Sequence, residues 1–180
     1  LYSNTTSSSN TAVGYQAGYY SNGGTLSVFV GKGAGYSANS SYSVYIGAAS
    51  GSNYGSAYSA DYNTIVGWNS GNSLQTGAYN TALGASALAS NTTASNNTAV
   101  GYQALYSMTV GNSGLANNTA LGCQAGYGNT TGTWNTYLGY QTGFGNSTGS
   151  VTSVVSGGTP PYTYTWSNSQ VTPNISNLAG

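Results

Sequence analysis

Side chains able to do acid–base or metal chemistry are scarce in this 180-residue sequence. Lys32 is the only basic residue, Asp61 the only acidic one and Cys123 the only cysteine, and there is no histidine. Acid–base catalysis needs a positioned titratable group, usually with a partner, and metal sites need clustered histidine, cysteine or carboxylate ligands. We therefore expect no enzyme, no metal site and no cofactor. One lysine cannot neutralise a row of phosphates, which excludes nucleic-acid binding. Cys123 can form no internal disulfide, and we interpret it as a small apolar side chain rather than an intermolecular bridge.

Aromatic stacking is the first chemistry that this composition leaves open. Tyr15, Trp68, Tyr102 and Tyr140 hold one position of the repeat described below. They are candidates for stacking on the apolar faces of sugar rings or for packing between coils or chains. Enrichment of aromatic residues at interfaces favours packing. A second aromatic position is held by Tyr19, Tyr36, Tyr106, Tyr127 and Phe144.

Glycosylation is the second chemistry left open, because Asn-x-Ser/Thr sequons are frequent. Attached sugar would supply the surface polarity that the missing charges do not. Many of these sequons arise from composition alone, and Ser/Thr glycosylation is equally open. The candidate sites are Asn4, Asn39, Asn91, Asn96, Asn117, Asn129, Asn146 and Asn174.

The composition points away from an ordinary cytosolic domain. Charged residues make up 1% of the chain and the net charge is zero, whereas a typical domain has about 25% charged residues. Disorder pairs low hydrophobicity with high net charge, so 18 tyrosines and three tryptophans in a neutral chain favour a packed structure. Zero net charge promotes self-association, which suits an extracellular or cell-surface fibre. No apolar run approaches 18 residues, so we expect no membrane-spanning helix.

A repeat built around a glycine dominates the sequence. One clear copy, beginning at Asn97, reads Asn-Thr-Ala-Val-Gly-Tyr-Gln-Ala, and eight copies follow one another at intervals of 16 to 21 residues. We interpret a partial copy at Thr109, inside the longest interval, as an insertion, with a degenerate short coil as the alternative. The central glycines are Gly14, Gly31, Gly47, Gly67, Gly84, Gly101, Gly122 and Gly139.

Each copy predicts a short strand and one coil of a solenoid. The residue before the glycine is always Val, Ile or Leu, and two positions earlier stands Thr or Val, as in Thr98 and Val100. β-Branched residues at alternate positions are typical of strands, and we expect this pair to face inward. The variable residue between them, such as Ala12 or Tyr137, is then expected outward. Stacked coils of this kind bury a continuous thin core, so the predicted fold is an all-β parallel β-solenoid with almost no helix.

Two further positions of the repeat predict backbone features. Asparagine leads six of the eight copies and serine leads two, so we expect a hydrogen-bonded amide ladder from coil to coil. The invariant glycine predicts a positive φ or a close approach between backbones.

The repeat resembles the head repeats of YadA-type trimeric autotransporter adhesins, and similar repeats occur in proteins like phage tail fibres. The resemblance covers about residues 10–145. It implies a left-handed parallel β-roll, often trimeric, displayed outside the cell. On this basis residues 1–9 are an N-terminal extension and residues 10–148 a solenoid domain. The chain begins in the middle of a pattern, which suggests a processed or partial protein.

The last 30 residues change in character. All three prolines lie here, and Tyr162-Thr-Tyr-Thr-Trp166 alternates like a half-buried strand. The stretch Gly157-Gly-Thr-Pro-Pro-Tyr-Thr-Tyr-Thr-Trp166 is similar to the SprB-type repeat of Bacteroidota adhesins, which implies the start of an immunoglobulin-like sandwich over residues 149–180. A sandwich needs about 100 residues, so we expect either a continuation of the chain or completion by strand addition from a neighbouring subunit.

Two functional hypotheses follow. The first is a structural subunit of an extracellular bacterial fibre or adhesin stalk that assembles with copies of itself, as a trimer or a filament, and carries glycans. The second is a receptor- or glycan-binding head of a trimeric adhesin or phage-type fibre. Outer aromatics buried between chains favour the first, and an open aromatic strip favours the second. An ice-binding face of threonines is a third possibility, disfavoured because the threonine column is expected to face inward with one threonine per coil.

Overall fold

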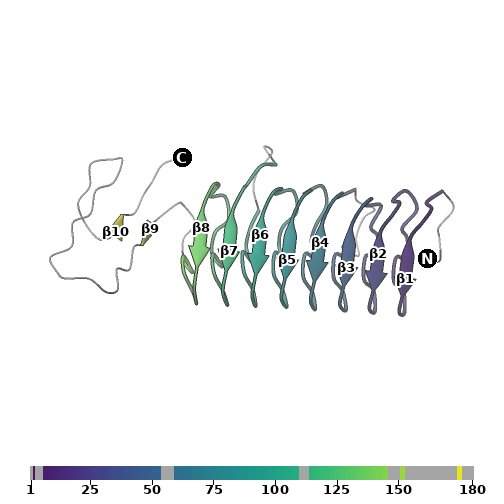
Figure 1. Cartoon of the computed structure of the whole chain (residues 1–180), viewed down its shortest axis with the longest axis horizontal. Coiled ribbons are helices and arrows are strands. Elements are labelled where there is room, and N and C mark those ends of the chain that lie inside the picture. Colours follow the sequence, from purple (N-terminus) through teal and green to yellow (C-terminus); the bar gives the residue numbers. More distant parts are fainter. Residues whose placement is uncertain are drawn as a thin grey trace.

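A computed structural model describes residues 2, 6–53, 59–109 and 114–145, together with the backbone of two short strands at 151–152 and 174–175. Eight three-residue parallel strands form one sheet in sequence order, and no helix occurs in these ranges. Figure 1 shows them side by side in a single row, with β1 at the end nearest the N-terminus. The strands are β1 (Thr11–Val13), β2 (Val28–Val30), β3 (Val44–Ile46), β4 (Thr64–Val66), β5 (Thr81–Leu83), β6 (Thr98–Val100), β7 (Thr119–Leu121) and β8 (Thr136–Leu138). The predicted all-β parallel solenoid is confirmed.

Successive strands pair in the register that the repeat predicts. Thr64 lies opposite Thr81, and Val66 lies opposite Leu83. The longest interval is also a single coil, because Val100 of β6 pairs directly with Leu121 of β7. The extra residues are thus an insertion, although 110–113 lie outside the described residues. Two further strands, β9 (Val151–Thr152) and β10 (Asn174–Ile175), pair antiparallel.

The repeat glycine marks the point where consecutive coils approach most closely. Gly67 has a φ of +136°, and a Cβ atom built on it would lie 2.5 Å from the carbonyl oxygen of Gly84. Seven of the eight repeat glycines meet the next one in this way, and only Gly139, in the last coil, meets Thr142 instead. Both expected features, positive φ and close approach, are present.

The leading asparagines form the predicted amide ladder inside the solenoid. The backbone N–H of Asn97 donates to Oδ1 of Asn80 (3.0 Å), and the N–H of Asn118 donates to Oδ1 of Asn97 (3.1 Å). Where serine replaces asparagine the hydroxyl takes over, since Oγ of Ser43 accepts the N–H of Asn63 at 3.1 Å. These side chains are buried, so the ladder satisfies backbone donors that water cannot reach.

The expected orientation of the strand faces is wrong. The central residue of each strand points inward: Phe29, Tyr45, Ile65 and Ala82 are fully buried, whereas the Thr and Val/Ile/Leu positions beside it are half-buried or exposed. β-Branching indicated a strand correctly, but branched residues suit either face of a sheet. The variable position holds the core because its size is matched to a second position in the coil.

That second position lies six residues after the strand centre and compensates the volume of the strand residue in six of the eight coils. The coils of β1 and β7 pair Ala12 with Gly18 and Ala120 with Gly126 instead, and a Cβ on Gly126 would meet Leu105 and Tyr137 of the neighbouring coils. Where the centre is large, the second residue is glycine: a Cβ on Gly51 would lie 3.0 Å from the Tyr45 ring, and one on Gly71 would lie 3.2 Å from Ile65. Where the centre is Ala82 or Ala99, the second residue is a leucine, Leu88 or Leu105.

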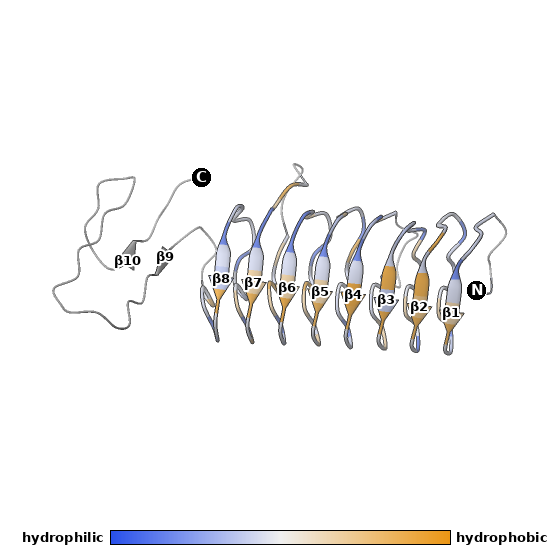
Figure 2. Cartoon of the chain, viewed as in Figure 1, coloured by the Kyte–Doolittle hydropathy of each residue, from blue (hydrophilic) through white to orange (hydrophobic). Residues whose placement is uncertain are grey.

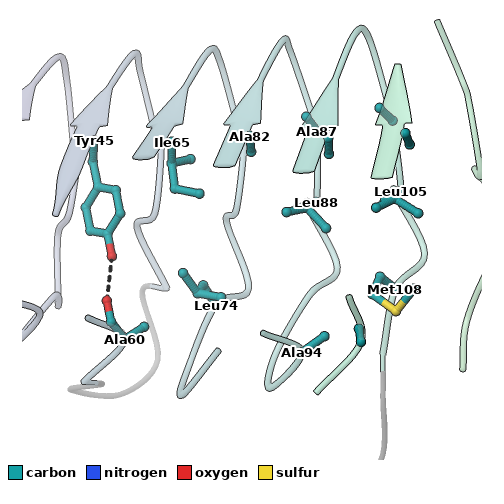
Figure 3. Packing of buried hydrophobic residues seen from close by; sticks show 14 of the residues in the cluster. Tyr45, Ala60, Ile65, Leu74, Ala82, Ala87, Leu88, Ala94, Leu105 and Met108 are labelled. Carbon is teal, nitrogen blue, oxygen red and sulfur yellow. Dashed lines mark hydrogen bonds between the residues drawn. The ribbon is translucent and has the colours of Figure 1, made fainter. Parts of the chain in front are cut away.

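Figure 3 shows Tyr45 and Ile65 pointing from their strands into the interior, with Leu88 and Leu105 filling the interior of later coils. The Tyr45 hydroxyl donates to the carbonyl oxygen of Ala60 at 3.2 Å. Residues of the described ranges form one continuous core along the solenoid. Among those residues we find no helix long and apolar enough to span a membrane.

Candidate functional site

The outward face of the sheet is a regular surface that runs along all eight described strands. Two columns run along it. One is the Thr/Val column, exposed at Thr64, Thr81 and Thr98, and the other is the aliphatic column, in which Leu83 and Leu138 are 49% and 69% exposed. In Figure 2 β2 is hydrophobic along its length, whereas β4 to β8 are hydrophobic toward their C-terminal ends. Apolar side chains that a core prediction would bury thus lie in contact with solvent.

A row of exposed aromatics borders this face, just after the repeat glycine. Trp68, Tyr102 and Tyr140 are 61%, 50% and 72% exposed. They stand in the coils of β4, β6 and β8, so each is separated from the next by one intervening coil. The intervening coils carry the small residues Ala85 and Cys123 at this position. We call Trp68, Tyr102 and Tyr140 the alternate row.

The remaining aromatic candidate of this column stands apart from the alternate row. Tyr15 is exposed in the first coil, and the next two coils carry Lys32 and Ala48 at the same position. Three coil steps therefore separate Tyr15 from Trp68, against two between members of the alternate row.

The other tyrosine columns behave differently, because their rings stack on consecutive coils. Tyr106 and Tyr127 are stacked with ring centroids 5.1 Å apart and an interplanar angle of 8°. Tyr19 and Tyr36 stack at 5.3 Å, which supports the packing interpretation for this second column. A third column precedes the leading asparagine: Tyr62 stacks between Tyr42 and Tyr79 at 5.0 and 4.9 Å.

A glutamine ladder lies beside the alternate row, and sequence reasoning missed it. Nε2 of Gln124 donates to Oε1 of Gln103, and Nε2 of Gln141 donates to Oε1 of Gln124, each at 2.9 Å. The signal was present in the repeat, where glutamine stands two residues after the repeat glycine in the three consecutive coils of β6, β7 and β8. Each amide nitrogen has two N–H groups, so one per residue remains for a ligand.

The few residues with reactive side chains do not gather. Oδ1 of Asp61 accepts the backbone N–H of Ser41 at 2.7 Å, which ties two coils together. Lys32 is exposed in the second coil, and Cys123 is a half-buried free thiol in the seventh. Within the described ranges no group of three metal-ligating side chains occurs.

The candidate glycosylation sites fall into different environments. Asn91 and Asn129 are fully buried, and each donates from Nδ2 to a carbonyl three residues ahead, so the folded chain withholds both from modification. Asn39 is half-buried and its Oδ1 accepts the backbone N–H of Asn22. Of the other candidates, Asn96 is exposed and Asn117 is half-buried, while Asn4, Asn146 and the side chain of Asn174 lie outside the described residues.

Two buried tyrosine hydroxyls have raised pKa values. Burial raises the pKa of Tyr137 to about 12. Its hydroxyl finds no hydrogen-bond partner among the described residues, and neither does Nδ2 of Asn135 in the same coil. Burial also raises the pKa of Tyr45, opposed by hydrogen bonds with neighbours such as Ser40. These groups lie inside the solenoid and form no surface site.

Comparison with known proteins adds one match. Residues 144–171 match the family model of the SprB repeat, which places the similarity where the sequence changes in character. Nothing among the curated proteins or the solved structures matches this chain. The resemblance of the coils to YadA-type head repeats therefore stays a prediction.

Proposed function

We propose that this chain is a non-catalytic structural subunit of an extracellular fibre or adhesin stalk, which assembles with copies of itself through the outward sheet face. One observation carries the proposal: the aliphatic column that ends each strand is turned to solvent, with Leu83, Leu121 and Leu138 among its exposed members. The SprB repeat match supports a surface location, because that family is associated with cell-surface adhesins.

The dimensions of the face fit a contact between copies. Eight strands at about 4.8 Å per step, and five residues at about 3.3 Å each, give a face of about 600 Å². It approaches the roughly 800 Å² per partner of a standard interface. No charge repulsion opposes the contact, since Lys32 and Asp61 are the only charged side chains.

Sedimentation of purified chains tests this proposal. We expect the unmodified chain to form a discrete oligomer or a filament, and a Leu83→Asn, Leu121→Asn double variant to sediment as a monomer. The matched control is Leu115→Asn, which changes an equally exposed leucine (56%) outside the aliphatic column. A monomeric unmodified chain at high concentration, or a double variant that still assembles, would overturn the proposal.

A second candidate function gains support from the corrected strand faces. The threonines of β4 to β8 are all exposed, in five consecutive coils: Thr64, Thr81, Thr98, Thr119 and Thr136. The objection that this column faces inward no longer applies, and a regular array of hydroxyl and methyl groups in register from coil to coil suits ice binding. Thermal hysteresis of the monomeric Leu83→Asn, Leu121→Asn variant would test it. Ice growth unchanged by this variant and by the unmodified chain would exclude this candidate.

A further inference from the structure

The alternate row differs from the other aromatic columns in its spacing. Rings that pack for stability lie on consecutive coils and touch, as Tyr62 and Tyr79 do at 4.9 Å. The row has small residues between its members, so its rings are separated by two coil steps. At about 4.8 Å per step this separation is about 9.6 Å along the solenoid axis. Exposed rings held apart at a regular distance leave their faces available to a ligand with the same period.

An extended β-1,4-linked glucan has a matching period. In such a chain every second sugar presents the same face, and the repeat of two sugars is close in length to two coil steps. The face of a glucose ring carries C–H groups and packs well against an aromatic ring, whereas its edge carries hydroxyls. A single glucan chain lying along the axis would thus place one ring face over each of Trp68, Tyr102 and Tyr140.

Hydrogen-bonding groups lie beside the alternate row in the coils of β6 to β8. The glutamine ladder occupies three consecutive coils: Gln103 and Gln141 follow Tyr102 and Tyr140, Gln124 stands in the coil between them, and Trp68 is followed by Asn69 instead. Gln124 and Gln141 each use one of their two amide N–H groups within the ladder, which leaves the other for a ligand. Gln141 is exposed and Gln124 is half-buried, so both can reach a bound molecule. Ligand sites generally combine apolar and aromatic contact area with a few placed polar groups that fix the orientation of the ligand.

The charge of the surface selects among polysaccharides. No charged residue lies between Asp61 and the end of the chain, so the row stands on a neutral surface. An anionic polymer such as a nucleic acid or a sulfated glycan would find no counter-charge there. Ala85 and Cys123, between the rings, offer no good hydrogen-bond partner for an acetamido substituent, which favours an unsubstituted glucan over chitin.

We propose that the alternate row is a binding surface for an extended β-1,4-glucan such as cellulose, which runs parallel to the solenoid axis. This inference deepens the proposed function, because it names the surface to which an adhesin subunit would attach. The proposed glucan surface lies at the edge of the sheet face, at the turn after the strands. The aliphatic column therefore stays available for contacts between copies.

The test is a depletion isotherm of the whole chain on microcrystalline cellulose. The row variant combines Trp68→Ala, Tyr102→Ala and Tyr140→Ala. Its matched control combines Tyr42→Ala, Tyr62→Ala and Tyr79→Ala, which removes three similarly exposed rings that stack on consecutive coils. We expect at least a tenfold loss of affinity for the row variant and less than a twofold change for the control. Tyr102→Phe keeps the ring and should keep binding, so it separates loss of a ring face from loss of folding.

The spacing itself can be tested with Ala85→Tyr. The added ring would stand between Trp68 and Tyr102 and close the gap that the sugar period requires, so we expect weaker binding although aromatic area increases. Stronger binding of this variant, equal binding of all variants, or retention on chitin without retention on cellulose would overturn the inference. Sedimentation of the same samples keeps the two proposals separate: assembly without cellulose binding contradicts this inference alone, and binding by a monomer contradicts the assembly proposal alone.

Discussion

Exchanging a volume pair between coils is the sharpest test of how the core is built. The coil of β4 combines Ile65 with Gly71, and the coil of β5 combines Ala82 with Leu88. We consider Ala82→Ile together with Leu88→Gly, which gives the β5 coil the pair that the β4 coil already has. Both positions are fully buried, so each single change should be costly and the double change should be tolerated.

The magnitudes follow from the two sites. Ala82→Ile alone overpacks a filled interior, at a cost of about 1–3 kcal/mol. Leu88→Gly alone removes a buried leucine, for which the related Leu→Ala change costs about 2.7–5 kcal/mol. Leu88 has a φ of +52°, and glycine relieves about 1–2 kcal/mol of that left-handed strain. The two single changes should therefore sum to about 4 kcal/mol, whereas the double variant should lie within about 1.5 kcal/mol of the unmodified chain.

Urea unfolding followed by circular dichroism measures the four free energies of this cycle. We expect a coupling energy of about 3 kcal/mol that favours the double variant. The control combines Ala82→Ile with Leu105→Gly, the equivalent leucine of the next coil, and its coupling should stay below about 1 kcal/mol. Leu88→Gly should also be more stable than Leu88→Ala, since only glycine relieves the positive φ. Additive single changes, or an equal coupling in the control, would show that the two positions do not share one space.

Three other changes test separate features. Gly67→Ala puts a Cβ 2.5 Å from the next coil's backbone at a φ of +136°, so thermal unfolding should show that the free energy of unfolding falls by more than about 3 kcal/mol. The control is Gly145→Ala, where a Cβ would meet nothing within 4 Å and the change should be less than about 0.5 kcal/mol. Asn97→Leu leaves the buried N–H of Asn118 without its acceptor and should cost about 1–3 kcal/mol in urea unfolding, with Asn97→Ser milder because serine holds this position elsewhere. The pKa of Tyr137 is raised to about 12, so the folded state retains a proton that the unfolded state loses above about pH 10. The contribution of this group to the free energy of unfolding should therefore be complete below pH 10. It should fall by up to about 2.7 kcal/mol between about pH 10 and 12. Tyr137→Phe should reduce that decline, with a remainder from Tyr45, whose pKa burial also raises. It should not destabilise the chain at pH 7, since the hydroxyl has no partner among the described residues. An unchanged alkaline decline would contradict this assignment.

The sequence predicted the features that depend on backbone geometry. An invariant glycine and a leading asparagine restrict the backbone to few arrangements. A side chain at Gly67 would collide with the next coil, and a buried N–H needs an acceptor. The register, the coil count and the single insertion followed from the spacing of those residues. Each of these inferences depended on a single position of the repeat, compared across its copies.

The direction of the strand faces could not be predicted from single positions. Alternation shows that two faces differ, but it does not say which face is inside. The deciding information lay in a pair: Tyr45 occurs with Gly51 and Ala82 with Leu88, six residues apart in both cases. Such compensation indicates that the two positions fill one space. This pairing, rather than the alternation along the strand, is the sequence pattern that indicates an inward strand centre.

The inward orientation of the strand centres also determines which coils can gain further burial from a partner. In the coil of β7 the interior holds Ala116, Ala120 and Ala125, whereas Leu121 lies outside at 48% exposure. Full burial of a leucine contributes about 1.5–3 kcal/mol, more than an alanine can. The largest remaining gain in apolar burial for this coil therefore lies on its outer face, and only a second molecule can supply it. Stability and assembly are then coupled: the coil of β7, with its alanine core, should gain the most protection from hydrogen exchange when copies associate, and coils with aromatic cores, such as those of β2 and β3, the least.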